Sequence, residues 1–144
     1  MSIENETLTL EFDGGSRGNP GPAAAGAVVR AADGTPLVTI GKFLGRATNN
    51  VAEYRGLILA MEKALELGAK RVEIRGDSEL IVRQMNGQYR VKSPDLRPLY
   101  EAAQSLLRKF ESASITHNLR HHTTLADRLA NLAMDRKADV EELP

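Results

Sequence analysis

The chain has 144 residues, of which 42% are hydrophobic and 26% charged, a composition that fits one globular domain with a single packed core. Its 19 basic and 19 acidic residues balance, which argues against a protein that coats nucleic acid through bulk positive charge but leaves room for a local nucleic-acid site. The absence of cysteine excludes disulfides, thiolate metal ligands and a thiol nucleophile.

The first third of the chain predicts three strands. Residues 7–13 (TLTLEFD) alternate polar and apolar side chains, as a strand with one buried face does. Residues 24–34 predict a second strand that ends at the turn signal Asp33-Gly34, and residues 35–45 predict a third. Because the connections are short, we expect an antiparallel meander.

The apolar period then changes to that of a helix. Residues 49–70 predict a helix with Asn49 or Asn50 as its N-cap and Gly68 as its C-terminal stop. The remaining chain alternates between the two types of element, with strands over 71–77 and 113–119 and helices over 78–87, 94–112 and 125–139.

This order predicts an α/β fold: a mixed five-stranded sheet, with three meandering strands and two parallel ones, and helices on both faces. We expect one domain over residues 1–144, with a core from about residue 7 to 138 and a frayed tail over 139–144. We see no secretory signal or membrane span, and therefore expect a cytoplasmic protein.

Four acidic residues fall near the ends of predicted elements. Asp13 ends the first strand and Asp77 the fourth, while Glu53 and Asp127 lie in the first turns of the first and last helices. If the first and fourth strands are adjacent and parallel, Asp13 and Asp77 lie side by side at the edge where open α/β sheets place their sites.

Each acid also has a purely structural interpretation. Acids in first helical turns, such as Glu53 and Asp127, are stabilised by the helix dipole. Asp77 before Ser78 suits a helix start, and Asp13 before two glycines suits a turn. These interpretations predict acids at several ends of the molecule that need not converge.

Convergence would call for a cation, because several carboxylates within a few ångströms cannot all stay ionised without one. Ligation by oxygen alone favours Mg²⁺ or Mn²⁺. A carboxylate site for two such ions, about 3.5–4 Å apart, is suited to hydrolysing a phosphodiester by in-line displacement.

Four motifs, spread over about residues 7 to 137, resemble the type 1 ribonuclease H family. They read FDGGSRGNPGPAAAGAVV, TNNVAEYRGLILAMEKALELG, RVEIRGDSELIVRQMNG and ADRLANLAMD. The resemblance implies a ribonuclease H-like fold and an endonuclease that hydrolyses the RNA strand of RNA–DNA hybrids, leaving 5′-phosphate and 3′-hydroxyl ends. It also implies two Mg²⁺ ions, with Mn²⁺ as a substitute, held by Asp13, Glu53, Asp77 and Asp127.

The resemblance further implies contacts with the hybrid from two segments, at Gly14, Gly15, Asn19, Arg46, Thr48 and Asn49. The first three would lie against the RNA backbone, where contacts to 2′-hydroxyl groups distinguish RNA from DNA. Of the last three, Arg46 and Thr48 would grip a phosphate of the DNA strand, and Asn49 would contact the hybrid near Glu53. A plain surface turn and an N-cap are the structural alternatives.

The segment 115–127 departs from the family pattern, since the usual proline and asparagine are missing. His117 keeps the family's spacing before the last acid and is our candidate to protonate the departing 3′-oxygen or assist product release. Arg120 is its rival. His121 and His122 have no assigned role, and all three histidines could instead be exposed loop residues.

Only residues 88–95 occupy the place where larger members carry a basic helix and loop. We therefore expect a compact, prokaryotic ribonuclease HI-like protein without that handle, acting as a monomer with no obligate protein partner. Two alternatives remain: another nuclease of the same fold, such as a DNA junction resolvase, or a non-catalytic module that binds nucleic acid.

Overall fold

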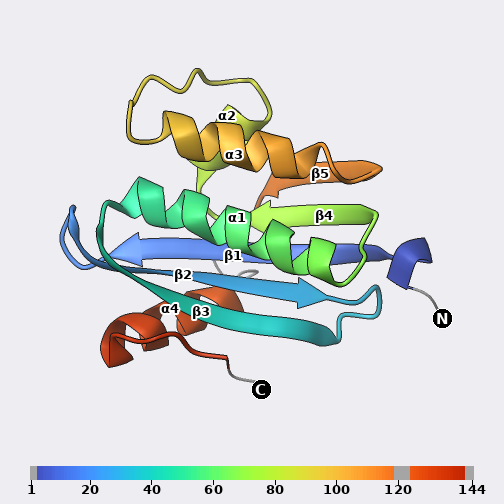
Figure 1. The fold of residues 1–144 in the computed structure, drawn as a ribbon, viewed down its shortest axis with the longest axis horizontal. Coiled ribbons are helices and arrows are strands. Elements are labelled where there is room, and N and C mark those ends of the chain that lie inside the picture. Colours follow the sequence, from blue (N-terminus) through green and yellow to red (C-terminus); the bar gives the residue numbers. More distant parts are fainter. Residues whose placement is uncertain (1–2, 119–123, 142–144) are drawn as a thin grey trace.

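The computed structural model describes residues 3–118 and 124–141 and contains a mixed five-stranded sheet with helices on both faces (Figure 1). The predicted fold class is therefore confirmed. The elements are the 3₁₀ helix η1 (Ile3–Asn5), β1 (Thr7–Ser16), β2 (Gly21–Arg30), β3 (Pro36–Ala47), α1 (Asn49–Glu66), β4 (Arg71–Gly76), α2 (Glu79–Met85), α3 (Arg97–Leu107), β5 (Ser112–His117) and α4 (Thr124–Arg136).

The strand order is β3-β2-β1-β4-β5, which puts β1 in the middle of the sheet. The meander β1-β2-β3 is antiparallel, as predicted, whereas β4 is parallel to both β1 and β5. In the β1–β4 register, Phe12 lies opposite Gly76, so Asp13 and Asp77 are the next residues on two neighbouring strands. This register brings the two acids to the same edge of the sheet.

Each face of the sheet is covered by its own set of helices. The neighbouring residues Val28 and Val29 of β2 point to opposite faces, as alternation along a strand requires. Val29 belongs to the larger core, built with α1, α2 and α3, and Val28 packs against Leu129 and Ala133 of α4 in the smaller one. Burial on both faces makes β1 and β2 the rigid centre of the molecule.

Helix α1 lies close to β1 because each element has a glycine where it meets the backbone of the other. A Cβ atom on Gly14 of β1 would overlap the carbonyl group of Ala52, and one on Gly56 of α1 would overlap the carbonyl oxygen of Asp13. Both contacts fall within a few residues of predicted site acids. The spacing between helix and strand therefore fixes how far Glu53 lies from Asp13.

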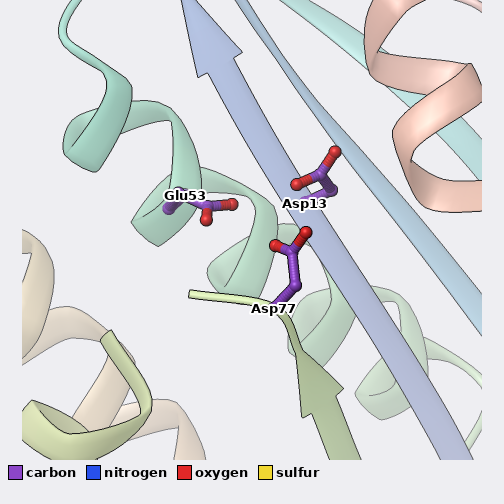
Figure 2. Close-up of side chains that lie close together, drawn as sticks. All are labelled: Asp13, Glu53 and Asp77. Carbon is purple, nitrogen blue, oxygen red and sulfur yellow. The ribbon is translucent and has the colours of Figure 1, made fainter. Parts of the chain in front are cut away.

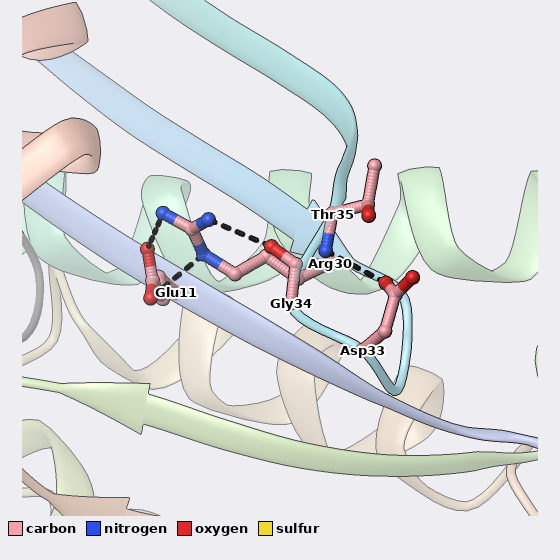
Figure 3. A network of polar contacts seen from close by, with 5 residues as sticks. All are labelled: Glu11, Arg30, Asp33, Gly34 and Thr35. Atoms are coloured by element: carbon pink, nitrogen blue, oxygen red, sulfur yellow. Dashed lines mark hydrogen bonds and ion pairs between the residues drawn. The ribbon is translucent and has the colours of Figure 1, made fainter.

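The hairpin between β2 and β3 is tied to β1 by a polar network (Figure 3). Arg30 forms an ion pair with the buried Glu11, at 3.2 Å between Nε and Oε2, and its Nη1 donates to the carbonyl oxygen of Gly34. The amide of Thr35 donates to the side chain of Asp33, a hydrogen bond that lowers the pKa of that carboxyl group. The Asp33-Gly34 turn was predicted correctly.

The helix starts agree in part with the predictions. Ser78 caps α2 and Pro98 lies in the first turn of α3. The N-cap of α1, however, is Thr48, whose Oγ1 accepts from the Val51 amide, and neither Asn49 nor Asn50 has this role. Because α1 therefore begins at Asn49, Glu53 lies beyond its first turn, contrary to the prediction, and the helix dipole does not explain this acid.

Two residues of the expected frayed tail are bonded to the sheet. Val140 pairs with Gly41 on the outer edge of β3 through two backbone hydrogen bonds of 2.7 Å, and its side chain is buried. The Asp139 carboxylate accepts from the Phe43 amide. The prediction of a frayed tail is therefore wrong at these positions, because the open edge of β3 offers them backbone partners.

β1 continues through Ser16, so Asp13 lies inside the strand. The prediction that Asp13 ends the first strand is therefore wrong. The predicted helices are longer than those observed, with α1 ending at Glu66 and α3 spanning Arg97–Leu107. None of the helices among the described residues combines the length and apolar character needed to cross a membrane.

Enlarging Gly56 tests the close approach of α1 to β1. We expect Gly56→Ala to lower the free energy of unfolding by about 1–3 kcal/mol, because the added methyl group overpacks a contact with strand backbone. Urea denaturation measures this change. The control, Glu62→Ala, alters an exposed residue of the same helix and is expected to stay within about 0.5 kcal/mol. Equal effects of the two variants would mean that the contact is loosely packed.

Candidate metal centre

Three carboxyl groups from different parts of the chain point toward one another at the edge of the sheet (Figure 2). Asp13 comes from β1, Asp77 directly follows β4, and Glu53 reaches across from α1. Each offers an oxygen atom, and these atoms all lie within 4.8 Å of one another. This is the convergence that the structural interpretation of the acids did not require.

Local structure explains why each side chain faces the site. The parallel pairing with β1 ends at Gly76, so Asp77 leaves the ladder next to Asp13. Ser78, and not Asp77, accepts the hydrogen bond that caps α2, at 3.3 Å from the Ile81 amide. Glu53 occupies the face of α1 that meets β1, where it is buried with a relative exposure of 5%.

Asp127 joins the same site from α4. Its carboxyl group shares a hydrogen bond with that of Asp13. It also lines a cavity of about 270 Å³ together with the other three acids. Asn131, one turn further along α4, donates to the Asp127 carbonyl oxygen at 3.0 Å. All four predicted acids therefore lie around one cavity.

Burial and neighbouring negative charge oppose ionisation of Asp13 and Glu53. Burial, the hydrogen bond with Asp127 and the negative charge of Asp77 raise the pKa of Asp13 to about 8. Burial and the charges of Asp13 and Asp77 raise the pKa of Glu53 to about 9. The Gly14 amide lowers both pKa values, but it is outweighed. By itself, the protein therefore disfavours full ionisation of the acids it has gathered.

The donor set fits a hard divalent cation. Oε1 of Glu53 has no hydrogen-bond partner among the described residues, although it is buried, and a buried carboxylate oxygen without a partner is costly. The neighbouring donors are all carboxylate oxygens, the ligands typical of Mg²⁺ and Mn²⁺ sites. A bound cation would satisfy the oxygen and offset the repulsion between the acids.

Two of the three predicted RNA-side residues lie beside the acids, together with Asn49, which was predicted to contact the hybrid near Glu53. Gly14, Gly15 and Asn49 line the cavity. The Asn49 side chain accepts from the Ser16 amide at 3.2 Å, and the Asn49 amide donates to the Asn19 side chain at 2.9 Å. These bonds join the turn after β1 to the start of α1, so the turn holds a defined position over the cavity.

The predicted DNA-side residues flank this network. Arg46 is exposed near the end of β3, and Thr48 uses its hydroxyl group to cap α1. They are separated by one residue and precede the N-terminal end of a long helix, an arrangement that can accept an anion. The N-cap function of Thr48 leaves its role in substrate binding a prediction.

His117 does not line the cavity that holds the acids. Its Nε2 lies 3.2 Å from the carbonyl oxygen of Asp77, and its ring faces a groove between α2 and β5 that is also lined by Glu79 and Arg83. The rival candidate Arg120, like His121 and His122, lies outside the described residues.

The sequence analysis missed five residues that line the cavity: Ser16, Arg17, Ala130, Asn131 and Met134. Arg17 was within reach of that analysis, since it stands in the glycine-rich stretch that follows Asp13. Asn131 follows Asp127 by four residues and so shares its face of a helix. A larger cavity of about 350 Å³ between β3 and the C-terminal end of α1 lies away from the acids.

Comparisons with known proteins give matches that extend over most of the chain. The model of a family described as reverse transcriptase-like matches residues 11–133. The bifunctional protein Rv2228c of Mycobacterium tuberculosis is 52% identical over 132 residues, which cover 91% of this chain and 36% of the relative. The chain thus spans about a third of the length of that curated relative.

Two solved structures are similar over nearly their whole length. The RNase H1 of the halophilic archaeon Halobacterium salinarum shares 46% sequence identity, with a TM-score of 0.88 and coverage of 90% of this chain and 98% of that one. LC11-RNase H1, solved in complex with an RNA/DNA hybrid, shares 39% identity, with a TM-score of 0.86 and coverage of 91% and 99%.

Removing one acid should relieve the repulsion. In the presence of a chelator at pH 7, we expect Asp13→Asn to raise the free energy of unfolding by at least about 1 kcal/mol, roughly the equivalent of one pKa unit. The raised pKa means that the wild-type protein loses stability as pH rises from about 4 toward about 8, so the gain grows over that range. Thermal denaturation at several pH values measures it.

The same experiment tests the cation site. Millimolar Mg²⁺ is expected to raise the melting temperature of the wild-type protein and to have a smaller effect on Asp13→Asn. Glu62→Gln, which removes an exposed carboxylate from α1, should respond to Mg²⁺ as the wild type does. A destabilised Asp13→Asn in chelator would contradict the account of mutual repulsion.

Proposed function

Since this chain belongs to the type 1 ribonuclease H family, we propose that it hydrolyses the RNA strand of RNA–DNA hybrids and leaves 5′-phosphate and 3′-hydroxyl ends. The hybrid duplex is the proposed partner, and the relative solved with an RNA/DNA hybrid supports this choice. The proposal concerns the activity of this chain, which is shorter than its mycobacterial relative.

The observation that carries the proposal is the convergence of carboxylates around the partnerless oxygen of Glu53. Separate elements bring Asp13, Glu53, Asp77 and Asp127 to one cavity, although their charges repel. An arrangement that costs stability is more readily explained by a function than by helix capping or turn formation.

We propose that these four acids hold divalent cations, with Mg²⁺ as the preferred ion, Mn²⁺ as a substitute and two ions in each site. When bound, such ions would neutralise charge on the scissile phosphate and activate water as the nucleophile. The acids would hold those ions at the edge of the sheet, where β1 and β4 supply a rigid support.

The turn after β1 is proposed to face the RNA strand. Gly14 and Gly15 line the cavity, and the Asn19 side chain accepts from the amide of Asn49, which also lines it. Backbone amides and an asparagine side chain can bond to 2′-hydroxyl groups, which DNA lacks. Arg46 and Thr48 are proposed to contact a phosphate of the DNA strand at the start of α1.

For His117 we keep the proposed role in protonating the 3′-oxygen or assisting product release. In the present arrangement its ring contacts the Asp77 backbone beside the site, so taking this role requires its side chain to turn toward the cavity. Arg120 remains the alternative candidate for the same task.

A cleavage assay tests the proposed function directly. With Mg²⁺, the wild-type protein is expected to cut the RNA strand of a labelled hybrid and to leave single-stranded RNA and duplex DNA intact. Asp77→Asn is expected to lower kcat by on the order of 10³-fold or more, because a metal-assisted step draws several kcal/mol from the bound ions. Initial rates and analysis of the product ends provide the measurement.

The matched control is Asp95→Asn, which removes an exposed carboxylate between α2 and α3 and should leave kcat unchanged. Cutting restricted to duplex DNA would point to another nuclease of this fold. Lack of Mg²⁺ binding by calorimetry, together with hybrid binding but no cutting, would point to a non-catalytic module.

A further inference from the structure

Arg17 is the one basic side chain among the described residues that line the cavity of the acids. It stands in the turn between β1 and β2, where its amide donates to the Pro22 carbonyl oxygen at 2.8 Å. The backbone of this turn is therefore fixed, while the side chain extends toward α4. Its position raises the question of why a cation lies at the rim of an acidic site.

The side chain is held in place from α4. Nη2 of Arg17 lies 2.7 Å from Oδ1 of Asp135 and 3.5 Å from the carbonyl oxygen of Asn131. The side chains of Arg17 and Asp135 are 48% and 59% exposed, so this ion pair contributes little to stability, about 0–1 kcal/mol. An exposed ion pair of this kind restrains the guanidinium group but can open at little cost.

Some N–H donors of the guanidinium group are not used by these contacts. Both recorded contacts use Nη2, and Nε and Nη1 have no partner among the described residues. Arginine carries five N–H donors in a planar arrangement that suits phosphate oxygens. Arg17 can therefore bind an anion without giving up Asp135.

The negative charge around the cavity favours a contact between Arg17 and a substrate phosphate. Four carboxyl groups surround the cavity, and a nucleic-acid strand brings further negative charge to it. Cations bound by the acids act at the scissile phosphate, whereas the neighbouring phosphates of the same strand need a positive group at the rim. Arg17 occupies that rim: its backbone is in the turn after β1, and its side chain reaches α4, the helix that carries Asp127.

We infer that Arg17 binds a backbone phosphate of the strand that is cleaved, next to the scissile one, and that Asp135 positions its guanidinium group before the substrate arrives. This inference rests on the proposed function. It assigns Arg17 to substrate binding and not to the chemical step, so its loss should affect KM and the salt dependence more than kcat.

The test compares Arg17→Ala with Asp135→Ala, which break the same ion pair from opposite sides. Hybrid cleavage is measured over a range of substrate and NaCl concentrations. Arg17→Ala is expected to raise KM about fivefold to tenfold, to leave kcat within about twofold, and to reduce the slope of log(kcat/KM) against log[NaCl] by about 1, as for the loss of one phosphate contact. Asp135→Ala keeps the guanidinium group and should not raise KM more than about twofold.

Arg108→Ala is the charge control. It removes an exposed arginine from the C-terminal end of α3, which precedes β5 and so lies at the opposite edge of the sheet from the acids. We expect KM and the salt slope of this variant to match those of the wild type. Thermal denaturation checks that all three variants remain folded, as the exposure of the ion pair leads us to expect.

Equal increases in KM for Arg17→Ala and Asp135→Ala would overturn the inference, since the pair would then only hold the turn against α4. An unchanged KM and salt slope for Arg17→Ala in an active enzyme would overturn the inference about Arg17 but not the proposed function. A wild-type protein that does not cleave the hybrid would overturn the proposed function and, with it, this assignment.

Discussion

The carboxyl groups of Asp13, Glu53 and Asp77 are held close together in a partly buried site, although burial and neighbouring negative charge oppose ionisation of Asp13 and Glu53. Isolated side chains with this charge would move apart into solvent. They stay together because their backbones belong to elements that cannot separate: two paired parallel strands and a helix packed on them. The free energy for holding the acids together therefore comes from the core and not from the site.

The packing around β1 shows how the core fixes the positions of the acids. Leu8, Leu10 and Phe12 are fully buried on one face of the strand, in the core shared with α1. Gly14 and Gly56 then let helix and strand backbone approach closely where the acids begin. A rigid apolar contact thus ends directly at a polar site, which gives the site a fixed geometry that a loop would not provide.

The rim of the site is joined by a second set of contacts, polar and largely exposed. Asn49 connects the turn after β1 to α1, and Arg17 connects the same turn to α4. These bonds are weak individually, but they fix the segments that would meet a nucleic acid relative to the acids beneath. The strong apolar packing thus fixes the positions of the acids that are proposed to bind metal, and the weaker polar contacts fix the surface that surrounds them.

The sequence by itself determined which residues are candidates for the chemistry and which strands and helices present them, because side-chain period, turn residues and the type of ligand atom are local properties. It left open whether the strands that carry Asp13 and Asp77 are adjacent and parallel, and the β1–β4 pairing shows that they are. Only the tertiary structure decided the rest. Three adjacent polar residues could cap α1, and the choice of Thr48 depends on Asn49 being engaged by Ser16 and Asn19. The pairing of Val140 with the edge of β3, the hydrogen bond between Asp13 and Asp127 and the ion pair of Arg17 likewise join residues far apart in the chain, and such contacts depend on packing that no local pattern encodes.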